Sequence, residues 1–442
     1  MMMDQPWLGF EDFSLPASLS GNVTCDYLIV GGGLTGLSIA YHLLKLAQKG
    51  KSITIIDAKW PGFGASAKSS GMIGPGVGLQ FHLLTKKHGE HAARMMFIET
   101  QKAVKYATNE ILNFKLNCDL NVGKQIKVAK DCYSASRLKL ERESLIKAGF
   151  DVPCLTGKAL QNQLGTKLYQ YALQYNGTAT VNPMKLVQSL IYRITELGGK
   201  VFFNTPANLN NIDIISKRHT LKAGQGSIKF KKLILATNGF SREQGVQENR
   251  VIPISTSMIM SNILTKSQLS NLGLIANTAV IESSRLFNYF RLTEDRRLLF
   301  GGSTPCYSKE KVAHDAPKWK PDIKIYRQLR KKFRQIFPKV DSFSFPYQWS
   351  GTIGATLDNF PVVSASNDKS VDTIVGWCGH GLAMSMLYGK RYADLQFGND
   401  INSFPWMRSK APYLAPAGLL APVTNGYISY MSTLDKFESV LG

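Results

Sequence analysis

A glycine-rich turn between two short apolar runs is the feature that most constrains how this chain can fold. The first run, Tyr27–Val30, is followed directly by glycines in the spacing GxGxxG, which are Gly31, Gly33 and Gly36. Apolar residues then recur at helical spacing, and a second apolar run, Ile53–Ile56, follows them. Short, fully apolar runs are typical of buried parallel strands. The segment therefore predicts a strand–helix–strand unit of a Rossmann-type α/β fold.

The glycines of this turn, and the acid that ends the second run, have physical roles in holding a dinucleotide. The first glycine allows the tight turn, the second lets the main chain approach a pyrophosphate, and the third lets helix and strand pack closely. Leu34 and Thr35 open the helix, whose free N–H groups and partial positive charge attract phosphate. Asp57 is placed to accept hydrogen bonds from ribose hydroxyls. These parts together predict a bound dinucleotide, and the alternative is a glycine turn that binds nothing.

Composition excludes several other classes of protein. The chain has 442 residues, of which 44% are hydrophobic and 19% charged, so it has room for two or three domains with buried cores. No apolar stretch is long enough to span a membrane, and the start shows no signal-peptide pattern. The six cysteines are scattered without a CxxC pair, as is typical of reduced thiols. We therefore expect a cytoplasmic, enzyme-sized protein.

Two histidines are spaced as a pair of metal ligands would be. His88 and His91 lie three residues apart in a segment predicted to be helical. No third ligand lies at a useful spacing, so we interpret the pair as part of a solvated helix face and expect no metal site.

The chain is strongly basic, with 53 Lys and Arg against 31 Asp and Glu and a formal net charge of +22. A surplus of this size attracts anions over about 10 Å, which leaves anionic lipid, RNA and acidic metabolites open as partners. No arginine-rich arm or recognition-helix pattern concentrates the charge, so nucleic acid is the less favoured partner. The densest cluster falls at helical spacing and predicts one exposed helix face: Arg327, Arg330, Lys331, Lys332 and Arg334.

A loop of small residues, Gly62–Gly74, follows the acid and favours a flavin over a nicotinamide. Small side chains let the main chain pass close to a flat ligand. Here the sequence resembles the D-amino-acid oxidase/glycine oxidase superfamily of FAD enzymes, in which a strand-ending acid is followed by a G-x-x-(S/T) loop and a glycine-rich turn against the isoalloxazine. The resemblance implies FAD as the cofactor. It also implies FAD contacts from Ala58, Lys59, Ala65, Ser66, Ser70, Gly71, Met72 and Ile73.

Later segments extend the resemblance over residues 24–400, in the order that the family has them. These segments are Asn182–Leu186, Leu233–Gly239 with A-T-N-G, Tyr289–Leu292 with Y-x-R, Leu298–Gly302 with G-G, Thr356–Pro361 with T-x-D-x-x-P, and Gly376–Ser385 with G-H-G. The sequence is most similar to the gamma-glutamylputrescine oxidoreductase-like branch. The resemblance further implies that Ala207 and Thr237 lie on the nucleotide side of the cofactor.

The resemblance implies an enzyme that removes a hydride from the carbon next to an amine nitrogen and passes it to flavin N5. Tyr289 and Arg291 form the polar pair expected to contact the substrate, with a structural ion pair as the alternative for Arg291. His380 would tune the flavin or the substrate amine, or would be a structural residue of a glycine turn. The helix start expected to stabilise the anionic reduced flavin comprises Gly379, His380, Gly381 and Leu382.

Three departures from the family pattern bear on substrate and mechanism. Ile353 stands where amino-acid oxidases of the superfamily carry an arginine for the substrate carboxylate, so we expect an amine or an N-substituted amino acid. The two regions where covalent members attach flavin, Lys68–Ser70 and Trp349–Thr352, hold no Cys or His, so we expect non-covalent FAD. No lysine lies in Leu298–Phe300, where sarcosine-type oxidases carry one, which leaves oxygen and quinone open as electron acceptors.

These segments predict a discontinuous Rossmann-type FAD-binding domain and a substrate domain with a mixed, largely antiparallel sheet. The expected FAD domain comprises residues 20–85, 160–240 and 345–400. The expected substrate domain comprises 86–159 and 241–344, and a surface tail, 401–442, ends in one helix. Two other functions stay open. One is a membrane-surface dehydrogenase that reduces quinone, which would use the positive charge and the apolar tail, and the other is a non-catalytic or RNA-directed flavoprotein.

Overall fold

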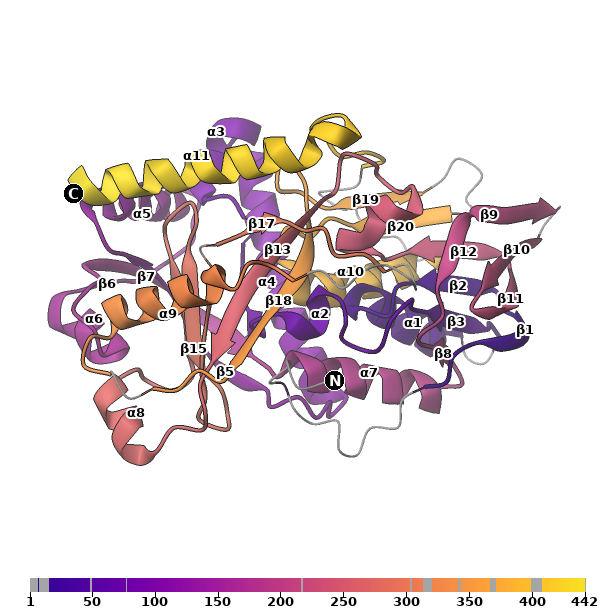
Figure 1. Ribbon diagram of the computed structural model, residues 1–442, viewed down its shortest axis with the longest axis horizontal. Coiled ribbons are helices and arrows are strands. Elements are labelled where there is room, and N and C mark those ends of the chain that lie inside the picture. The colour runs from indigo at the N-terminus through magenta and orange to yellow at the C-terminus, as the bar shows by residue number, and fades with distance from the viewer. Residues whose placement is uncertain are drawn as a thin grey trace.

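Three β-sheets divide the computed structural model along its long axis (Figure 1). A six-stranded sheet and a small four-stranded sheet lie toward one end, and a ten-stranded sheet lies toward the other. The structure describes residues 7, 16–47, 50–76, 78–215, 218–302, 304–312, 320–340, 343–365, 371–398 and 408–441.

The strand–helix–strand unit predicted from the glycine turn is present. β2 (Tyr27–Val30) and β3 (Ile53–Ile56) are fully buried parallel strands, and α1 (Leu34–Ala47) connects them. α1 is buried over most of its length because it packs between the sheet and α10 (Gly381–Gln396). A parallel sheet covered on both faces needs mostly apolar residues along its strands, which explains the two runs, in which Thr54 is the one polar residue.

The six-stranded sheet has the order β19–β20–β12–β2–β3–β8. Every neighbouring pair is parallel except β19 with β20. β3 and β12 lie on opposite sides of β2, and such a reversal of strand order opens a crevice at the carboxyl ends of the strands. The remaining strands are β8 (Lys200–Phe202), β12 (Lys232–Leu235), β19 (Val362–Ala365) and β20 (Val371–Val375).

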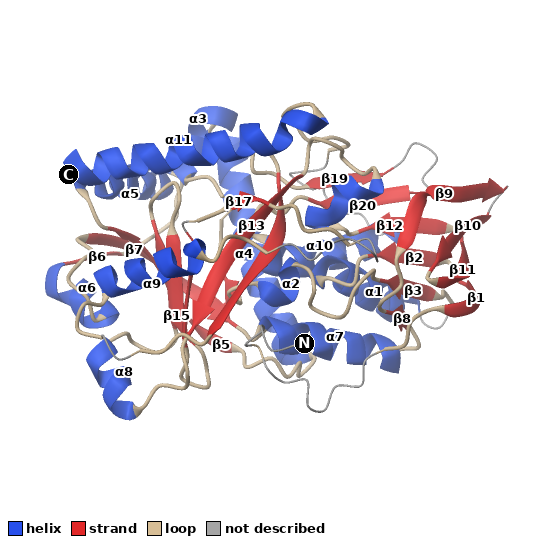
Figure 2. Ribbon diagram, viewed as in Figure 1, coloured by secondary structure: helices blue, strands red, loops and turns tan. Residues whose placement is uncertain are grey.

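A smaller sheet of order β1–β11–β10–β9 lies at the outer end of the six-stranded sheet (Figure 2). It shares a compact core with β2 and β12, in which Ile228 and Phe230 pack with Leu28 and Leu233. Its strands are β1 (Ser20–Thr24), β9 (Ala207–Ile215), β10 (Arg218–Ala223) and β11 (Gln225–Phe230).

The ten-stranded sheet has the order β17–β13–β16–β15–β14–β5–β7–β4, with β18 paired to β13 and β6 paired to β7. All of its pairs are antiparallel except β5 with β14. The predicted combination of a Rossmann-type sheet with a mixed, largely antiparallel sheet is therefore confirmed. The strands are β4 (Met72–Ile73), β5 (Asn121–Ala129), β6 (Cys154–Thr156), β7 (Tyr171–Thr180), β13 (Ile252–Met260), β14 (Thr278–Glu282), β15 (Asn288–Leu292), β16 (Leu298–Gly302), β17 (Cys306–Tyr307) and β18 (Tyr347–Ala355).

Helices pack on both large sheets, and α9 (Lys324–Ile336) lies on the ten-stranded one. α9 carries the predicted basic face, on which Arg327, Lys331 and Arg334 are exposed, whereas Arg330 and Lys332 are partly buried. The other face of α9 packs Phe333 against Phe300 of the ten-stranded sheet. The remaining helices are α2 (Ala65–Lys68), α3 (Phe81–His88), α4 (Glu90–Asn113), α5 (Cys132–Lys147), α6 (Gly157–Leu164), α7 (Pro183–Glu196), η1 (Asn238–Gln244), α8 (Lys266–Leu272) and α9 (Lys324–Ile336).

The chain crosses between the sheets within the segments expected in the FAD domain, 20–85, 160–240 and 345–400: β4, β7 and β18 of these segments pair in the ten-stranded sheet. One detail differs from the expectations above. His88 and His91 do not share a helix, since Gly89 at φ 83° ends α3 and α4 begins at Glu90. Among the described residues, no group of His, Cys, Asp and Glu side chains is arranged to hold a metal ion.

The chain ends in η2 (Ala417–Leu419) and α11 (Leu420–Leu441), which runs along one edge of the molecule (Figure 1). The start of the expected tail, residues 401–407 with Pro405, lies outside the described residues. Of the helices described, none combines the length and the apolar character needed to cross a membrane.

Candidate functional site

The carboxyl edge of the six-stranded sheet brings together residues predicted from four distant segments. β2 leads into Gly31–Gly36, β3 ends at Asp57, β12 leads into Ala236 and Thr237, and β20 leads into the turn before α10. The first and third of these segments touch, because a Cβ at Gly31 would lie 2.5 Å from the carbonyl oxygen of Ala236. Gly31 also has φ 114°, a backbone conformation that favours glycine.

The other two glycines of the turn are close to neighbouring atoms. A Cβ at Gly36 would overlap the carbonyl oxygen of Gly31, and a Cβ at Gly33 would lie 2.9 Å from Oγ of Ser66. Leu34 donates its main-chain N–H to the same Ser66 Oγ over 2.9 Å. The small-residue loop therefore lies directly over the first turn of α1, where N–H groups lack partners within the helix.

Asp57 joins the loops on either side of the crevice. Its carboxylate accepts hydrogen bonds from the N–H of Gly32 at 2.8 Å and from the N–H of Lys59 at 2.9 Å. Burial raises the pKa of Asp57 to about 6, against the lowering effect of these two hydrogen bonds. A buried carboxylate of this kind is stabilised by further donors, and the hydroxyls of a ribose would supply them.

The segment after Asp57 runs beside the start of β9. The N–H of Thr205 donates to the carbonyl of Asp57 at 2.8 Å, and the N–H of Asn204 donates to the carbonyl of Lys59 at 3.1 Å. Ala58 thus lies between these two contacts, and Thr205 precedes Ala207, where β9 begins, by two residues. The geometry of these segments fits the adenosine half of a dinucleotide, because a buried acceptor and free helix N–H groups flank one crevice.

α10 begins at the same edge as α1, and the two helix starts are hydrogen-bonded to each other. Oγ1 of Thr35 lies 2.9 Å from Oγ of Ser385 and accepts the indole N–H of Trp377 at 2.9 Å. The turn before α10 has left-handed residues, Cys378 at φ 52° and Gly379 at φ 84°. α10 then begins at Gly381 without a side-chain cap, so its first N–H groups are directed toward the edge.

His380 is the residue that precedes α10, and its tautomer follows from its contacts. Its Nδ1 lies 3.0 Å from the carbonyl oxygen of Cys378, and because a carbonyl only accepts, Nδ1 carries the proton. Burial lowers the pKa of His380, and the charge of Lys127 lowers it further. The ring is therefore neutral at pH 7, with a lone pair on Nε2. Ile353 forms an apolar wall next to it, with Cδ1 3.7 Å from a Cβ at Gly379.

One row of residues crosses the face of the ten-stranded sheet that packs toward α1 and α10. Register-paired residues project from the same face of a sheet. The row is Leu173, Lys127, Ile281, Tyr289, Gly301, Met258 and Trp349. Tyr289 leans over Gly301, where a Cβ would lie 2.7 Å from its ring, and burial raises the pKa of its hydroxyl, so the phenol is a neutral hydrogen-bond donor at pH 7.

Arg291 lies on the same face, but its guanidinium is bound by main-chain carbonyls. Nε donates to Ser70 at 2.7 Å, Nη2 to Val181 at 2.7 Å and Nη1 to Leu292 at 3.2 Å. The ring of Trp7 covers the guanidinium at 5.3 Å. These contacts give Arg291 a structural reason for being buried, although its partners are main-chain carbonyls and not the ion pair that the sequence left open as the alternative.

The rest of the small-residue loop connects these parts. Arg291 fixes the carbonyl of Ser70, and a side chain at Gly71 would overlap the carbonyl of Val181. Met72 and Ile73 then form β4 against β7. The loop continues to Gly78, where a Cβ would lie 3.3 Å from Cε1 of His380. Ala65 begins the short helix α2, and Thr237 lies at the end of β12, with Oγ1 2.9 Å from Oγ of Ser241.

Two buried ion pairs near this site had not been predicted from the sequence. Nζ of Lys127 donates to both carboxylate oxygens of Glu141, at 3.0 and 2.8 Å. Nζ of Lys68 lies 3.6 Å from Oε1 of Glu310, and burial lowers the pKa of Lys68. For Lys127 a signal existed: it stands between Ile126 and Val128 in a strand that buries both faces.

Comparison with known proteins agrees with this geometry. The family model for "FAD dependent oxidoreductase" matches residues 26–395. Gamma-glutamylputrescine oxidoreductase of Escherichia coli (strain K12) is 26% identical over 95% of both chains, and glycine oxidase of Bacillus licheniformis is 21% identical over 86% of this chain and 94% of its own. The crystal structure of glycine oxidase from Geobacillus kaustophilus has the same fold, with a TM-score of 0.69 at 18% identity over 89% of this chain and 100% of that chain. The chain belongs to the FAD-dependent oxidoreductase family, and it is an FAD-dependent oxidoreductase.

Proposed function

We propose that this enzyme oxidises an amine or an N-substituted amino acid at the carbon next to nitrogen, with FAD bound non-covalently. The observation that carries the proposal is the placement of His380: its Nδ1 is held by the carbonyl of Cys378, it precedes the uncapped start of α10, and Ile353 lies beside the neighbouring Gly379. The relatives support the substrate class, because glycine oxidase and gamma-glutamylputrescine oxidoreductase are named for substrates that contain an amine.

FAD, when bound, supplies the acceptor for the hydride and its electron pair. The protein supplies two helix N-termini at one edge of the sheet. The start of α1, with Leu34 and Ser66, is suited to the pyrophosphate. The start of α10, from Gly379 to Leu382, is suited to negative charge that develops on the ring system, because free N–H groups and the helix dipole stabilise an anion.

His380 orients the substrate amine. An amine must be neutral before hydride loss, since the ammonium form has no lone pair to stabilise the developing positive charge. Nε2 of His380 accepts an N–H of the neutral amine, because Nδ1–H is held by the carbonyl of Cys378. The neutral Tyr289 hydroxyl is a second hydrogen-bond donor for a polar group of the substrate.

The charges around the site favour a substrate whose carboxylate, if it has one, lies away from the amine. Ile353 offers no partner to a carboxylate, and Arg291 donates to main-chain carbonyls. Lys127 is the other cation of this sheet face described above, two strands from Tyr289, and it keeps one ammonium hydrogen after its two bonds to Glu141. Glycine and D-alanine, whose carboxylate and amine share one carbon, fit this arrangement poorly.

The regions that carry attachment residues in covalent relatives support non-covalent FAD. Lys68–Ser70 and Trp349–Thr352 hold no Cys or His. The two regions are instead packed together, with the indole N–H of Trp349 donating to the carbonyl of Lys68 at 3.1 Å. Acid or heat is therefore expected to release all flavin from the purified protein as FAD.

Anaerobic bleaching of the flavin by a panel of amines and amino acids tests the proposal. We expect bleaching by a larger amine or an N-substituted amino acid, and slow bleaching by glycine and D-alanine. Parallel assays for peroxide in air and for reduction of a soluble quinone identify the electron acceptor. Fast bleaching by glycine or D-alanine alone would overturn the substrate class, and flavin that stays on the denatured polypeptide would overturn non-covalent binding.

A further inference from the structure

An exposed flank of α11, beside the face that packs on the body of the protein, is a stripe of apolar side chains. We name Val423, Tyr427, Tyr430, Leu434 and Phe437 the outer stripe. Leu434 is half-buried, and the other four are 41%, 59%, 58% and 62% exposed in this order. The helix lies along the edge of the molecule, where a second molecule could approach it (Figure 1). Apolar residues gathered on one exposed face commonly mark an interaction site.

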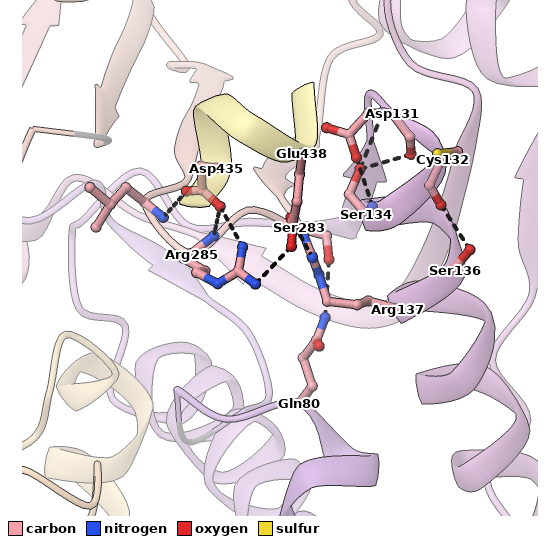
Figure 3. Close-up of polar contacts among 11 residues, drawn as sticks. Gln80, Asp131, Cys132, Ser134, Ser136, Arg137, Ser283, Arg285, Asp435 and Glu438 are labelled. Carbon is pink, nitrogen blue, oxygen red and sulfur yellow. Dashed lines mark hydrogen bonds and ion pairs between the residues drawn. The ribbon is translucent and has the colours of Figure 1, made fainter. Parts of the chain in front are cut away.

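Ion pairs on the inward side fix how α11 is rotated about its axis. Arg285 contacts Asp435 at 3.2 Å and Glu438 at 2.8 Å, and Arg137 contacts the other oxygen of Glu438 at 2.7 Å (Figure 3). The main-chain N–H of Leu286 also donates to Asp435 at 2.8 Å. Because both acids are held by arginines of the protein body, the rotation of the helix is fixed and the outer stripe stays on its exposed flank.

The spacing of the outer stripe is that of a helix-pairing seam. Its five residues follow one another at intervals of four, three, four and three positions. On a helix of 3.6 residues per turn this pattern fills an arc of about 80°, and the same 3.5-residue repeat lets two helices interlock their side chains. The side chains of such a stripe pack well between those of another helix that has the same repeat.

Charge indicates which partner fits. Residues 411–441 contain three charged side chains, Asp435, Lys436 and Glu438, whereas the whole chain has a net charge of +22. Two copies of such a basic protein repel one another except through a surface poor in positive charge. A helix that binds an anionic bilayer carries many Lys and Arg on its polar face, and α11 has one lysine. We infer that α11 pairs with α11 of a second copy, about a two-fold axis, and that the enzyme is a homodimer through this face.

Sedimentation velocity of the full-length holoprotein, over a wide range of concentration, tests this inference. We expect a dimer that persists at high salt, since screening weakens the repulsion between the basic bodies and leaves apolar contact intact. The double variant Tyr430→Glu/Phe437→Glu is expected to be monomeric with normal FAD content and thermal midpoint. Tyr192→Glu is the matched control, because Tyr192 is 61% exposed on α7 and lies outside the outer stripe. A milder variant, Tyr430→Ser/Phe437→Ser, serves if the glutamates impair folding.

Three outcomes would overturn the inference. The first is a wild-type holoprotein that stays monomeric at every concentration. The second is a dimer that the outer-stripe variants leave unchanged, which would move the interface to another face. The third is a monomer that floats with vesicles of phosphatidylserine and phosphatidylcholine and loses this binding in the outer-stripe variants, which would make a bilayer the occupant.

Discussion

The hydroxyl of Ser66 accepts a hydrogen bond from the main-chain N–H of Leu34, with 2.9 Å between the two atoms. Ser66 belongs to the small-residue loop and Leu34 begins α1, so this contact joins two segments that we expect to meet FAD. It satisfies one of the N–H groups that a helix start leaves unpaired, and the hydroxyl hydrogen stays available to a phosphate. FAD affinity is therefore expected to depend on the geometry of this junction.

Replacing Gly33 with valine is expected to remove FAD. A Cβ at this position would lie 2.9 Å from Oγ of Ser66, and the methyl groups would fill the space through which the main chain approaches a pyrophosphate. The ratio of flavin to protein absorbance after purification measures the effect. Gly418→Val is the control, since no atom lies within 4 Å of a Cβ at Gly418. Full flavin occupancy in Gly33→Val would contradict the assignment.

FAD affinity of the apoprotein is expected to rise with pH through about 6. Burial raises the pKa of Asp57 to about 6, and ribose hydroxyls donate to the ionised form, so below pH 6 binding must first remove a proton. Each pH unit below 6 then weakens binding by up to about tenfold. Titration of apoprotein with FAD, followed by fluorescence quenching, gives the profile. The variant Asp57→Asn should bind FAD more weakly and without this pH dependence, and an unchanged profile in the variant would contradict the prediction.

The same group affects the stability of the apoprotein in the opposite direction. Between the ordinary carboxyl pKa of 3.8 and the raised pKa of about 6, folded Asp57 holds a proton that the unfolded chain has lost. Stability therefore falls as pH rises through this window, and the loss is complete above pH 6. FAD offsets it, so the gain in thermal midpoint on adding FAD is expected to be larger at pH 7 than at pH 5.

Removing the His380 imidazole is expected to slow flavin reduction by about tenfold, because the hydrogen bond that orients the neutral amine contributes about 0.5–1.5 kcal/mol. His380→Ala should keep its FAD, because Nε2 is expected to contact the substrate amine. Burial lowers the pKa of His380 from 6.5, so in the wild type only the amine should titrate in the rate profile above pH 6.5. Cys378→Ser is the control, since the carbonyl that holds Nδ1 remains. A rate in His380→Ala equal to the wild type would contradict the role.

Lys127→Met is expected to raise KM for an amine that carries a remote carboxylate by about ten- to a hundred-fold, since a charged hydrogen bond contributes about 1.5–3 kcal/mol. KM for an amine without a carboxylate should not change. The double variant Lys127→Met/Glu141→Gln separates two effects of the single variant. One is the loss of the cation that binds the substrate carboxylate, and the other is the energetic cost of leaving the Glu141 carboxylate buried without a partner. If the double variant recovered KM for the carboxylate substrate, or if both substrates lost affinity equally, Lys127 would not be the anchor.

Arg291→Leu is expected to lower the free energy of unfolding by at least about 3 kcal/mol, because three main-chain carbonyls lose a charged donor. The change should appear in the thermal midpoint of the apoprotein and of the holoprotein alike. Arg327→Leu, an exposed arginine of α9, is the control. If the Arg291 variant had normal stability and only its KM rose, Arg291 would instead be a residue that binds the substrate.

The parts of the site that the sequence predicted are those determined over short range. GxGxxG and Asp57 lie within one strand–helix–strand unit, so local spacing places them at one edge. His380 was likewise marked by the glycines on both sides of it. The position of Ile353 beside Gly379 fits the interpretation that a carboxylate clamp is missing there.

The parts that the sequence left open depend on the direction of long side chains. The same Tyr-x-Arg pattern fits an arginine that points to a substrate and one that points to its own main chain, and only the contacts of Arg291 with Ser70 and Val181 distinguish them. Lys127 was missed because its partner, Glu141, lies on another element, α5. The sequence did not indicate that β7 pairs within the ten-stranded sheet, because a strand that crosses between sheets has no distinct composition.

Gly301 limits how this enzyme can diversify. Any side chain there would come within 2.7 Å of the Tyr289 ring and would also overlap Met258. A first substitution at Gly301 would therefore displace two neighbours at once, so a change of specificity through this position requires Tyr289 or Met258 to change beforehand. A library that varies these three positions together can therefore produce new pocket shapes directly. Single mutations made one after another would reach the same shapes only through poorly folded intermediates.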